Sequence, residues 1–197
     1  MDTCNVVLAG VGGQGILLAA EILGTAAVKE SYNVRVSELH GMAQRGGAVV
    51  SHVRIGEKAL APTVLEGTAD VIVGFEPMEV LRNIRFASQN TIVLANIKPF
   101  KISGAEYPPV EKLLEQLRSF TRNIVSVNAA TLAEKAGAVI TQNIVMIGAL
   151  AATGKLPLKT ETLKEALRES VPAKYLDINM RAFELGYNAV KMSHASV

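Results

Sequence analysis

The sequence predicts an α/β fold with a mostly parallel sheet, and three observations support this prediction. The apolar segment 5–9 is followed by the glycine-rich turn GVGGQG at 10–15 and then by the apolar segment 16–20, in the order strand, turn, helix. Apolar runs of strand length alternate with helical patterns as far as residue 154. Only helical patterns follow, so we expect a Rossmann-like three-layer fold with a helical C-terminal tail.

We expect one domain over 1–197, with an α/β core at 1–154 and the helical tail at 155–197. The segment 155–159 is the predicted hinge between the two parts. Hydrophobic residues make up 49% of the chain and charged residues only 19%. This apolar balance indicates subunit interfaces in addition to the core.

Composition also excludes several classes of protein. The net charge is +2, aromatic residues make up 5% and there is no Trp, so a nucleic-acid-binding surface is not expected. The N-terminus lacks a signal-peptide pattern. The longest nearly apolar run, 16–28, is interrupted by Glu21 and Thr25 and is shorter than the roughly 20 residues of a membrane helix. We therefore expect a cytoplasmic protein that does not bind membranes.

The single cysteine, Cys4, lies in or just before the first predicted strand. A lone buried cysteine is most often a small apolar residue, and no disulfide can form within the chain. A cubane iron–sulfur cluster needs about four thiolates, so this chain alone cannot hold one.

The first strand is predicted to end at Ala9 and the first helix to span 14–30. Gly10 and Gly12 would let the backbone turn tightly, and Gly15 would let the helix lie close to the strand. The free N–H groups at the helix start would suit a phosphate or a carboxylate.

A second strand is predicted at 33–37, with Glu38 at its end. Glu38 lies 23 residues after Gly15, close to the spacing at which an acid binds the ribose of a nicotinamide or flavin nucleotide. Glycine turns of this kind also serve only as packing devices, so both interpretations stay open.

The segment 38–47 interrupts the β-α-β rhythm with a polar, glycine-punctuated loop. His40, Gln44 and Arg45 place an imidazole, an amide and a cation together, which could bind an anion or contact a partner. The alternative is a structured surface loop in which Arg45 pairs with a carboxylate. No two histidines have the close helical spacing of a metal pair, so no metal site is predicted.

The strand at 48–56 is expected to place His52 and Arg54 on one face. A buried parallel strand follows at 69–75 and leads into Glu76-Pro77, where proline suits the first turn of a helix at 78–87. Glu76 is either a functional group at the carboxyl end of a strand or the cap of its own helix. Further strands are predicted at 91–96 and 123–127, and helices at 110–120, 130–136 and 142–152, the last ending at Gly154.

In the tail, Thr162 and Glu165 have the spacing of a capping box at a helix start, and the helix should stop before Pro172. The last helix is predicted at 177–191. Its buried stripe is expected to comprise Ile178, Ala182, Leu185 and Ala189.

The sequence contains no phosphate-loop motif, no nucleophile elbow and no cluster of metal ligands. An enzyme-like domain without a reaction centre suits a subunit that completes the site of another protein. No catalytic residue is therefore proposed.

Three blocks resemble one family: the turn at 10–15, the segment SELHGMAQRGG at 37–47, and SHVRIG at 51–56. The family is the gamma-type subunits of the 2-oxoacid:ferredoxin oxidoreductases. The segments 69–77 and 143–149 continue the likeness, as do Asn179, Ala182, Phe183 and Gly186 in the tail. The likeness spans essentially the whole chain and is greatest to the small (beta) subunits that serve indolepyruvate oxidation.

The resemblance implies a gamma-type subunit, inactive alone, of an anaerobic, CoA-dependent enzyme. That enzyme would oxidise indolepyruvate or other arylpyruvates to aryl-acetyl-CoA and pass electrons to ferredoxin. It also implies that thiamine diphosphate, Mg and the iron–sulfur clusters belong to a large (alpha) partner subunit in a hetero-oligomer, with a dimer expected when the chain is alone. The alternatives are a subunit of a pyruvate, ketoisovalerate or 2-oxoglutarate oxidoreductase, or a non-catalytic scaffold or nucleotide-binding module.

The candidate binding residues for CoA phosphates or another anion come from the two glycine-containing segments. They are Gly10, Gly12, Gly13, Gln14, Gly15, Glu38, His40, Arg45, Gly46 and Gly47.

Overall fold

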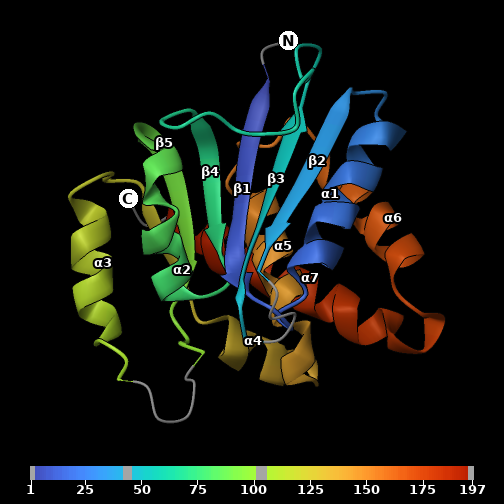
Figure 1. Cartoon of the computed structure of the whole chain (residues 1–197). Coiled ribbons are helices and arrows are strands. Elements are labelled where there is room, and N and C mark those ends of the chain that lie inside the picture. Colours follow the sequence, from blue (N-terminus) through green and yellow to red (C-terminus); the bar gives the residue numbers. More distant parts are fainter. Residues whose placement is uncertain (1–2, 42–45, 101–105, 195–197) are drawn as a thin grey trace.

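The computed structural model describes residues 3–41, 46–100 and 106–194. Within these ranges the chain forms one six-stranded sheet of order β2-β3-β1-β4-β5-β6 (Figure 1). Only β3 runs against the others, which confirms the predicted mostly parallel sheet. The strands are β1 Cys4–Val11, β2 Val34–His40, β3 Ala48–Ile55, β4 Ala69–Gly74, β5 Ala87–Asn96 and β6 Ile124–Val127.

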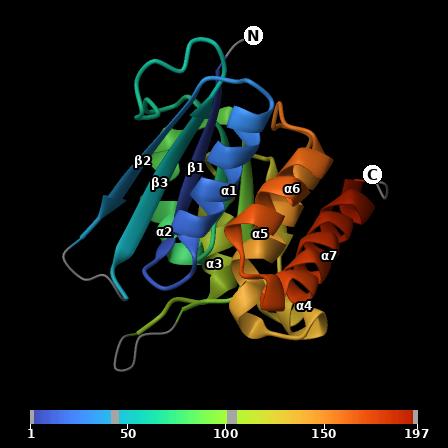
Figure 2. The same ribbon diagram turned by 90° about the vertical axis from the view of Figure 1, so that its right-hand side faces the viewer.

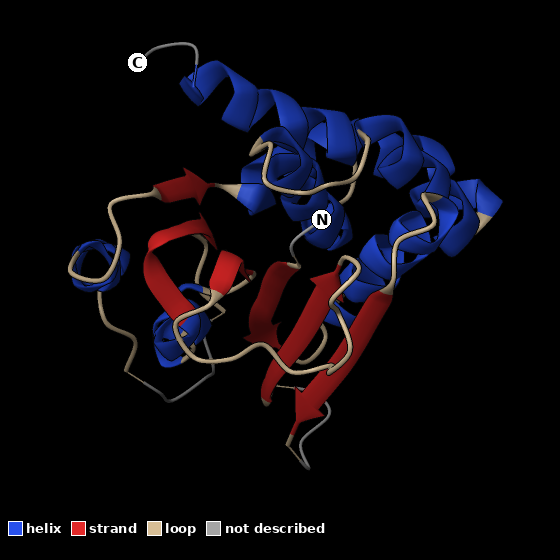
Figure 3. Cartoon of the chain, turned by 90° about the horizontal axis from the view of Figure 1, so that it is seen from above, coloured by secondary structure: helices blue, strands red, loops and turns tan. Residues whose placement is uncertain are grey.

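Helices cover both faces of the sheet, so the predicted three-layer arrangement is confirmed. Figure 2 shows α1, α5, α6 and α7 together on one side, and Figure 3 shows the same helical layer from above. α2 and α3 pack against each other on the opposite face. The helices are α1 Ile16–Lys29, α2 Pro77–Arg82, α3 Val110–Arg118, α4 Ala129–Ala136, α5 Gln142–Ala152, α6 Thr160–Ser170 and α7 Leu176–His194.

The sheet alternation divides the core in two. Val6 and Leu8 of β1 face the α1 and α5 side, whereas Val7 faces the α2 and α3 side. The larger core also contains Leu163 of α6 and Phe183 of α7. The C-terminal helices are thus packed into the same core as the strands.

α5 and α7 cross in very close contact. A Cβ added to Gly148 would lie 2.0 Å from the carbonyl oxygen of Phe183, and one added to Gly186 would lie 1.9 Å from that of Val145. The buried stripe of α7 therefore differs from the predicted one. It comprises Asn179, Ala182, Phe183, Gly186 and Val190, whereas Ile178, Leu185 and Ala189 are only partly buried.

Several predicted boundaries are wrong, for local reasons. β1 continues past Ala9 because Gly10 and Val11 pair with β3. α2 ends at Arg82 rather than at residue 87, since the side chain of Asn83 donates to the carbonyl of Glu79 and a short 3₁₀ turn follows.

Two more predictions need correction. β5 begins at Ala87, four residues before the predicted start. α6 begins at Thr160 after Lys159, so Thr162 lies inside the helix and does not cap it.

The segment 38–47 is less of a loop than predicted, because β2 extends to His40 and pairs with antiparallel β3. This hairpin inserts β3 between β1 and β2. The predicted split of faces in β3 agrees with the register, in which His52 pairs with Val7 and Ser51 with Leu8. In the described parts of the chain no helix is long and apolar enough to span a membrane.

Candidate functional site

The glycine-rich turn lies at the carboxyl edge of the sheet, where β1, β4 and β5 end. Gly13 and Gly15 have φ values of 102° and 73°, in the left-handed region that favours glycine. The left-handed backbone of the turn depends on Gly13 and Gly15, whereas at Gly10 a Cβ would clash with the Gln14 side-chain oxygen at 2.7 Å, so the predicted need for glycine there is confirmed. Gly15 forms the start of α1 without a side-chain cap.

Two of these glycines also permit close packing. A Cβ on Gly10 would lie 2.8 Å from the Cβ of Phe75, at the end of β4. A Cβ on Gly15 would lie 2.4 Å from the side-chain nitrogen of Asn143. Gly15 thus brings α1 close to α5, whereas the sequence predicted an approach to the strand.

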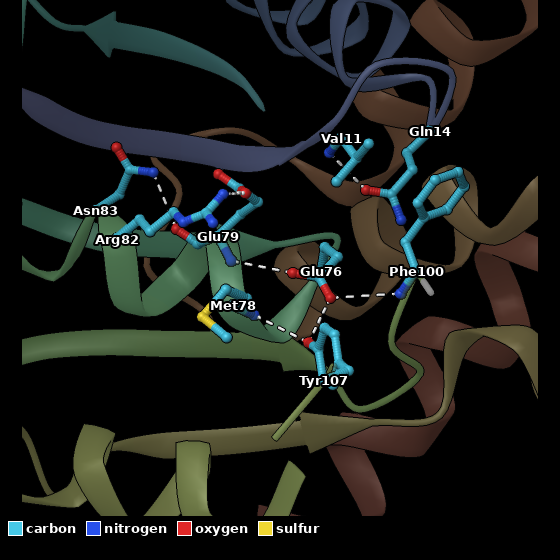
Figure 4. A network of polar contacts seen from close by, with 9 residues as sticks. All are labelled: Val11, Gln14, Glu76, Met78, Glu79, Arg82, Asn83, Phe100 and Tyr107. Carbon is cyan, nitrogen blue, oxygen red and sulfur yellow. Dashed lines mark hydrogen bonds and ion pairs between the residues drawn. The ribbon is translucent and has the colours of Figure 1, made fainter. Parts of the chain in front are cut away.

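Two amide side chains join the strand ends into one rigid edge. Gln14 Oε1 accepts a hydrogen bond from the Val11 N–H at 2.7 Å (Figure 4). Gln14 Nε2 donates to the Phe75 carbonyl at 3.1 Å. Asn96 Nδ2 donates to the same carbonyl at 3.1 Å, while its Oδ1 accepts from the Ala129 N–H at the start of α4. Sequence reasoning missed Asn96, although its position at the end of a strand was a usable signal.

The structure brings the first glycine segment against the second. The Gly12 N–H donates to the Gly47 carbonyl at 2.8 Å, and the Gly46 N–H donates to the Gly12 carbonyl at 3.2 Å. Both backbone polar groups of Gly12 are therefore used internally. The first N–H groups of uncapped α1 are the ones that an anion could contact.

His40 and Glu38 differ in their relation to this turn. His40 lines a cavity of about 570 Å³ together with Gly12, Gly13 and the first turn of α1. Glu38 lies two residues before His40 on β2, where it pairs with Ser51, and it does not line that cavity. The ribose contact of Glu38 stays a prediction. Gln44 and Arg45 lie outside the described residues.

Glu76 caps α2, and the capping interpretation is confirmed. Its side chain, in a residue only 1% exposed, accepts a hydrogen bond from the Glu79 N–H at 3.1 Å. The same carboxylate accepts from the Phe100 N–H at 3.3 Å and from the Tyr107 hydroxyl (Figure 4). Burial, followed by the hydrogen bond to Glu76, raises the pKa of Tyr107. Glu76 therefore fixes both the start of α2 and the chain after β5.

Glu79 is the second buried carboxylate at this edge. Its Oε1 lies 2.5 Å from Arg82 Nη1, and its Oε2 has no hydrogen-bond partner among the described residues. Burial raises its pKa, and Arg82 opposes that shift. The ion pair with Arg82 is thus the interaction that compensates for burying the Glu79 carboxylate.

The resemblance assigns the iron–sulfur clusters and the metal to the partner subunit, and the side chains of this chain do not fit such groups. The chain has one cysteine, Cys4, which is buried, and burial raises its pKa to about 12. No group of three metal-ligating side chains comes together in residues 3–41, 46–100 and 106–194. No chemical step of this chain is therefore assigned to such a group.

The chain is similar to known proteins along nearly its whole length. The sequence profile of the pyruvate ferredoxin/flavodoxin oxidoreductase family matches residues 5–189. An indolepyruvate oxidoreductase subunit of Thermococcus kodakarensis is 45% identical over 97% of this chain and 98% of its own length. The corresponding subunit of Archaeoglobus fulgidus is 43% identical, covering 93% and 94% of the two chains. The common gamma subunit of the Thermococcus kodakarensis pyruvate/ketoisovalerate oxidoreductases is 31% identical, covering 91% and 92%.

Solved structures share the fold. The pyruvate oxidoreductase subunit PORC of Thermotoga maritima matches with a TM-score of 0.71 at 24% identity, over 95% of this chain and 97% of its own. A 2-oxoglutarate:ferredoxin oxidoreductase chain of Magnetococcus marinus matches with a TM-score of 0.75 at 20% identity. That match covers 98% of this chain but 32% of the neighbour, in which this fold is one part of a longer polypeptide.

Proposed function

This chain belongs to the pyruvate ferredoxin/flavodoxin oxidoreductase family, and on that premise we propose that it is the small subunit of a CoA-dependent 2-oxoacid:ferredoxin oxidoreductase. The observation that carries the choice of substrate is the difference in identity between two groups of relatives. Identity is 45% to an indolepyruvate oxidoreductase subunit but 31% to a pyruvate/ketoisovalerate subunit from the same organism. The proposed substrates are therefore indolepyruvate and related arylpyruvates.

In the proposed reaction the bond between the carboxylate carbon and the keto carbon of the 2-oxo acid breaks, and CO₂ leaves. The remaining acyl group forms a thioester with the sulfur of CoA, the thiol proton is released, and the two electrons pass one at a time to ferredoxin. Thiamine diphosphate, Mg and iron–sulfur clusters held by the large subunit would supply the carbanion and redox chemistry. The contribution of this chain is architectural: its carboxyl edge is rigid, with Gln14 and Asn96 tying together the ends of three strands.

A substrate panel on the co-expressed complex tests this proposal. Reduction of ferredoxin or a viologen dye is followed with indolepyruvate, phenylpyruvate, pyruvate, ketoisovalerate and 2-oxoglutarate, each with and without CoA. We expect CoA-dependent reduction with the two arylpyruvates at the highest kcat/KM. Preference for pyruvate or 2-oxoglutarate would contradict the assigned substrate class.

A second candidate function is anion binding at the glycine turn, with the phosphates of CoA as the ligand. It is supported by the uncapped start of α1 and by His40 on the adjacent cavity. Calorimetry on the assembled complex with CoA, NAD and NADP tests it. Binding of CoA that weakens in His40→Ala supports this role. The absence of measurable binding by all three ligands rejects it.

A further inference from the structure

A separate pocket lies in the crevice beyond the carboxyl ends of β1, β4 and β5, and we call it the switch-point pocket. It is lined by Gly13, Phe75, Lys98, Phe100, Ile140 and Met146, among others, and encloses about 320 Å³. After β1 the chain passes through α1 on one face of the sheet, whereas after β4 it passes through α2 on the other. Open α/β sheets bind ligands at such a change of direction.

The walls of the switch-point pocket are mostly apolar and aromatic. Phe75 and Met146 are buried at its base, while Phe100 and Ile140 at its mouth are 43% and 86% exposed. The backbone N–H of Phe100 is bonded to Glu76, which fixes this segment of the wall before any ligand arrives (Figure 4). Such walls favour a flat apolar group.

The polar groups on the pocket favour one negative charge. Lys98 Nζ has no ion-pair partner in the described parts of the chain. Gln142 lies in the first turn of α5, at the positive end of its dipole. Gln14 and Asn96 are already hydrogen-bonded to the backbone. Glu134 also lines the pocket and disfavours a ligand with several negative charges, such as a nucleotide phosphate.

Size narrows the class of ligand further. Ligand pockets usually measure about 300–1,000 Å³, so a cavity of about 320 Å³ suits one ring system with a short side chain rather than a dinucleotide. We infer that the switch-point pocket binds an aromatic monocarboxylate, with its ring between Phe75 and Phe100 and its carboxylate at Lys98. The narrower identification of this ligand with an arylpyruvate rests on the proposed function.

Calorimetry on the purified full chain tests the inference, with indole-3-acetate and phenylpyruvate as probes. We expect saturable binding that falls at least tenfold in Lys98→Ala and in Phe100→Ala. Lys112→Ala and Phe120→Ala are matched controls, because these exposed side chains lie outside the pocket and should leave affinity unchanged. Indole, which lacks the carboxylate, should bind more weakly than indole-3-acetate, and Lys98→Ala should not weaken it further.

Absence of binding by both probes overturns the inference, as does equal loss of affinity in the control variants. Oxidation of indolepyruvate by the assembled wild-type complex is measured in parallel. If the complex oxidises indolepyruvate but neither probe binds the chain, the inference about the pocket is overturned and the proposed function is not. Probe binding that depends on Lys98 and Phe100, in a complex that oxidises no 2-oxo acid, overturns the proposed function and leaves the pocket standing.

Discussion

Glu76 uses a single carboxylate to hold two parts of the chain. It caps α2 through the Glu79 N–H, and it accepts from the Phe100 N–H and the Tyr107 hydroxyl on the segment that follows β5. All these donors converge on a residue that is almost completely buried. Removing the carboxylate leaves several donors without a partner in a site that water does not reach freely.

We therefore expect Glu76→Ala to destabilise the fold by more than the roughly 0.5–2 kcal/mol of a lost helix cap. Urea unfolding followed by circular dichroism measures this free energy. Glu106→Ala, at an exposed acid next to Tyr107 in the sequence, is the control and should change this free energy little. Equal unfolding free energies for the two variants would show that the Glu76 network does not stabilise the chain.

His52 is a fully buried histidine whose hydrogen bonding fixes its tautomer. Its Nδ1 accepts from the Val64 N–H at 3.0 Å, which places the proton on Nε2, and Nε2 has no partner among the described residues. Burial, with a smaller effect of Arg85, lowers the pKa of the ring. In the folded state the neutral form is therefore favoured.

The sign of the pH dependence follows from this shift. Because the folded-state pKa lies below the ordinary value of 6.5, the unfolded chain binds more protons as pH falls below about 6.5. We expect the unfolding free energy to decrease between about pH 7 and pH 5, with a smaller decrease in His52→Gln. Chemical denaturation at each pH measures the free energy of unfolding of the wild type and of His52→Gln. The same pH dependence in both proteins would contradict a lowered pKa of His52.

At the residue scale, sequence reasoning located the glycine turn but not the chemistry around it. Gly15 stood out in a recognisable pattern, and it is the N-cap of α1, which begins at Ile16 rather than at the predicted residue 14. Asn96 and Tyr107 were missed because their partners, Phe75 and Glu76, are 21 and 31 residues away along the chain. Such long-range hydrogen bonds leave no local pattern.

The crossing of α5 and α7 shows how an element can depend on single glycines. At Gly148 and Gly186 an added Cβ would meet the backbone carbonyl of the facing helix, and backbone cannot move aside as a side-chain end can. We expect Gly148→Ala and Gly186→Ala each to destabilise the chain by about 1–3 kcal/mol. Thermal unfolding shows whether each variant is less stable than the wild type, and denaturant unfolding measures the change in the free energy of unfolding.

Gly24→Ala in α1 is the matched control, because its added Cβ would lie at an ordinary 3.6 Å from Val36. In a helix interior this change should stabilise by roughly 0.5–1 kcal/mol. The same Gly→Ala substitution is therefore expected to lower the free energy of unfolding at the α5–α7 crossing and to raise it at Gly24. Stabilisation by Gly148→Ala would show that the close crossing is absent in solution.

At the element scale, most helices and strands were predicted, but the packing stripe of α7 was not. Periodicity placed Ile178, Leu185 and Ala189 inward, yet the helix is rotated so that Gly186 and Phe183 meet α5. A hydrophobicity pattern favours large apolar residues at an interface, whereas the interface between α5 and α7 needs glycine, the smallest residue. The antiparallel insertion of β3 was missed for a similar reason, since strand order depends on contacts between distant segments.

The whole molecule has the features of a subunit. Its mean hydropathy is +0.28, and exposed apolar side chains such as Phe100, Ile140 and Tyr175 line the cavities that meet at Gly13. In the Magnetococcus marinus structure the same fold is part of a chain about three times as long. Apolar surface beside the carboxyl edge is consistent with a chain that works against a larger partner.

The most direct test of the central claim is an add-back titration. The large subunit is expressed alone, this chain is added in increasing amounts, and the rate of indolepyruvate- and CoA-dependent ferredoxin reduction is measured. We expect a rate near zero for either subunit alone and a rate that rises with added chain to a plateau at a fixed ratio of the two subunits. Full activity of the large subunit without this chain would contradict it.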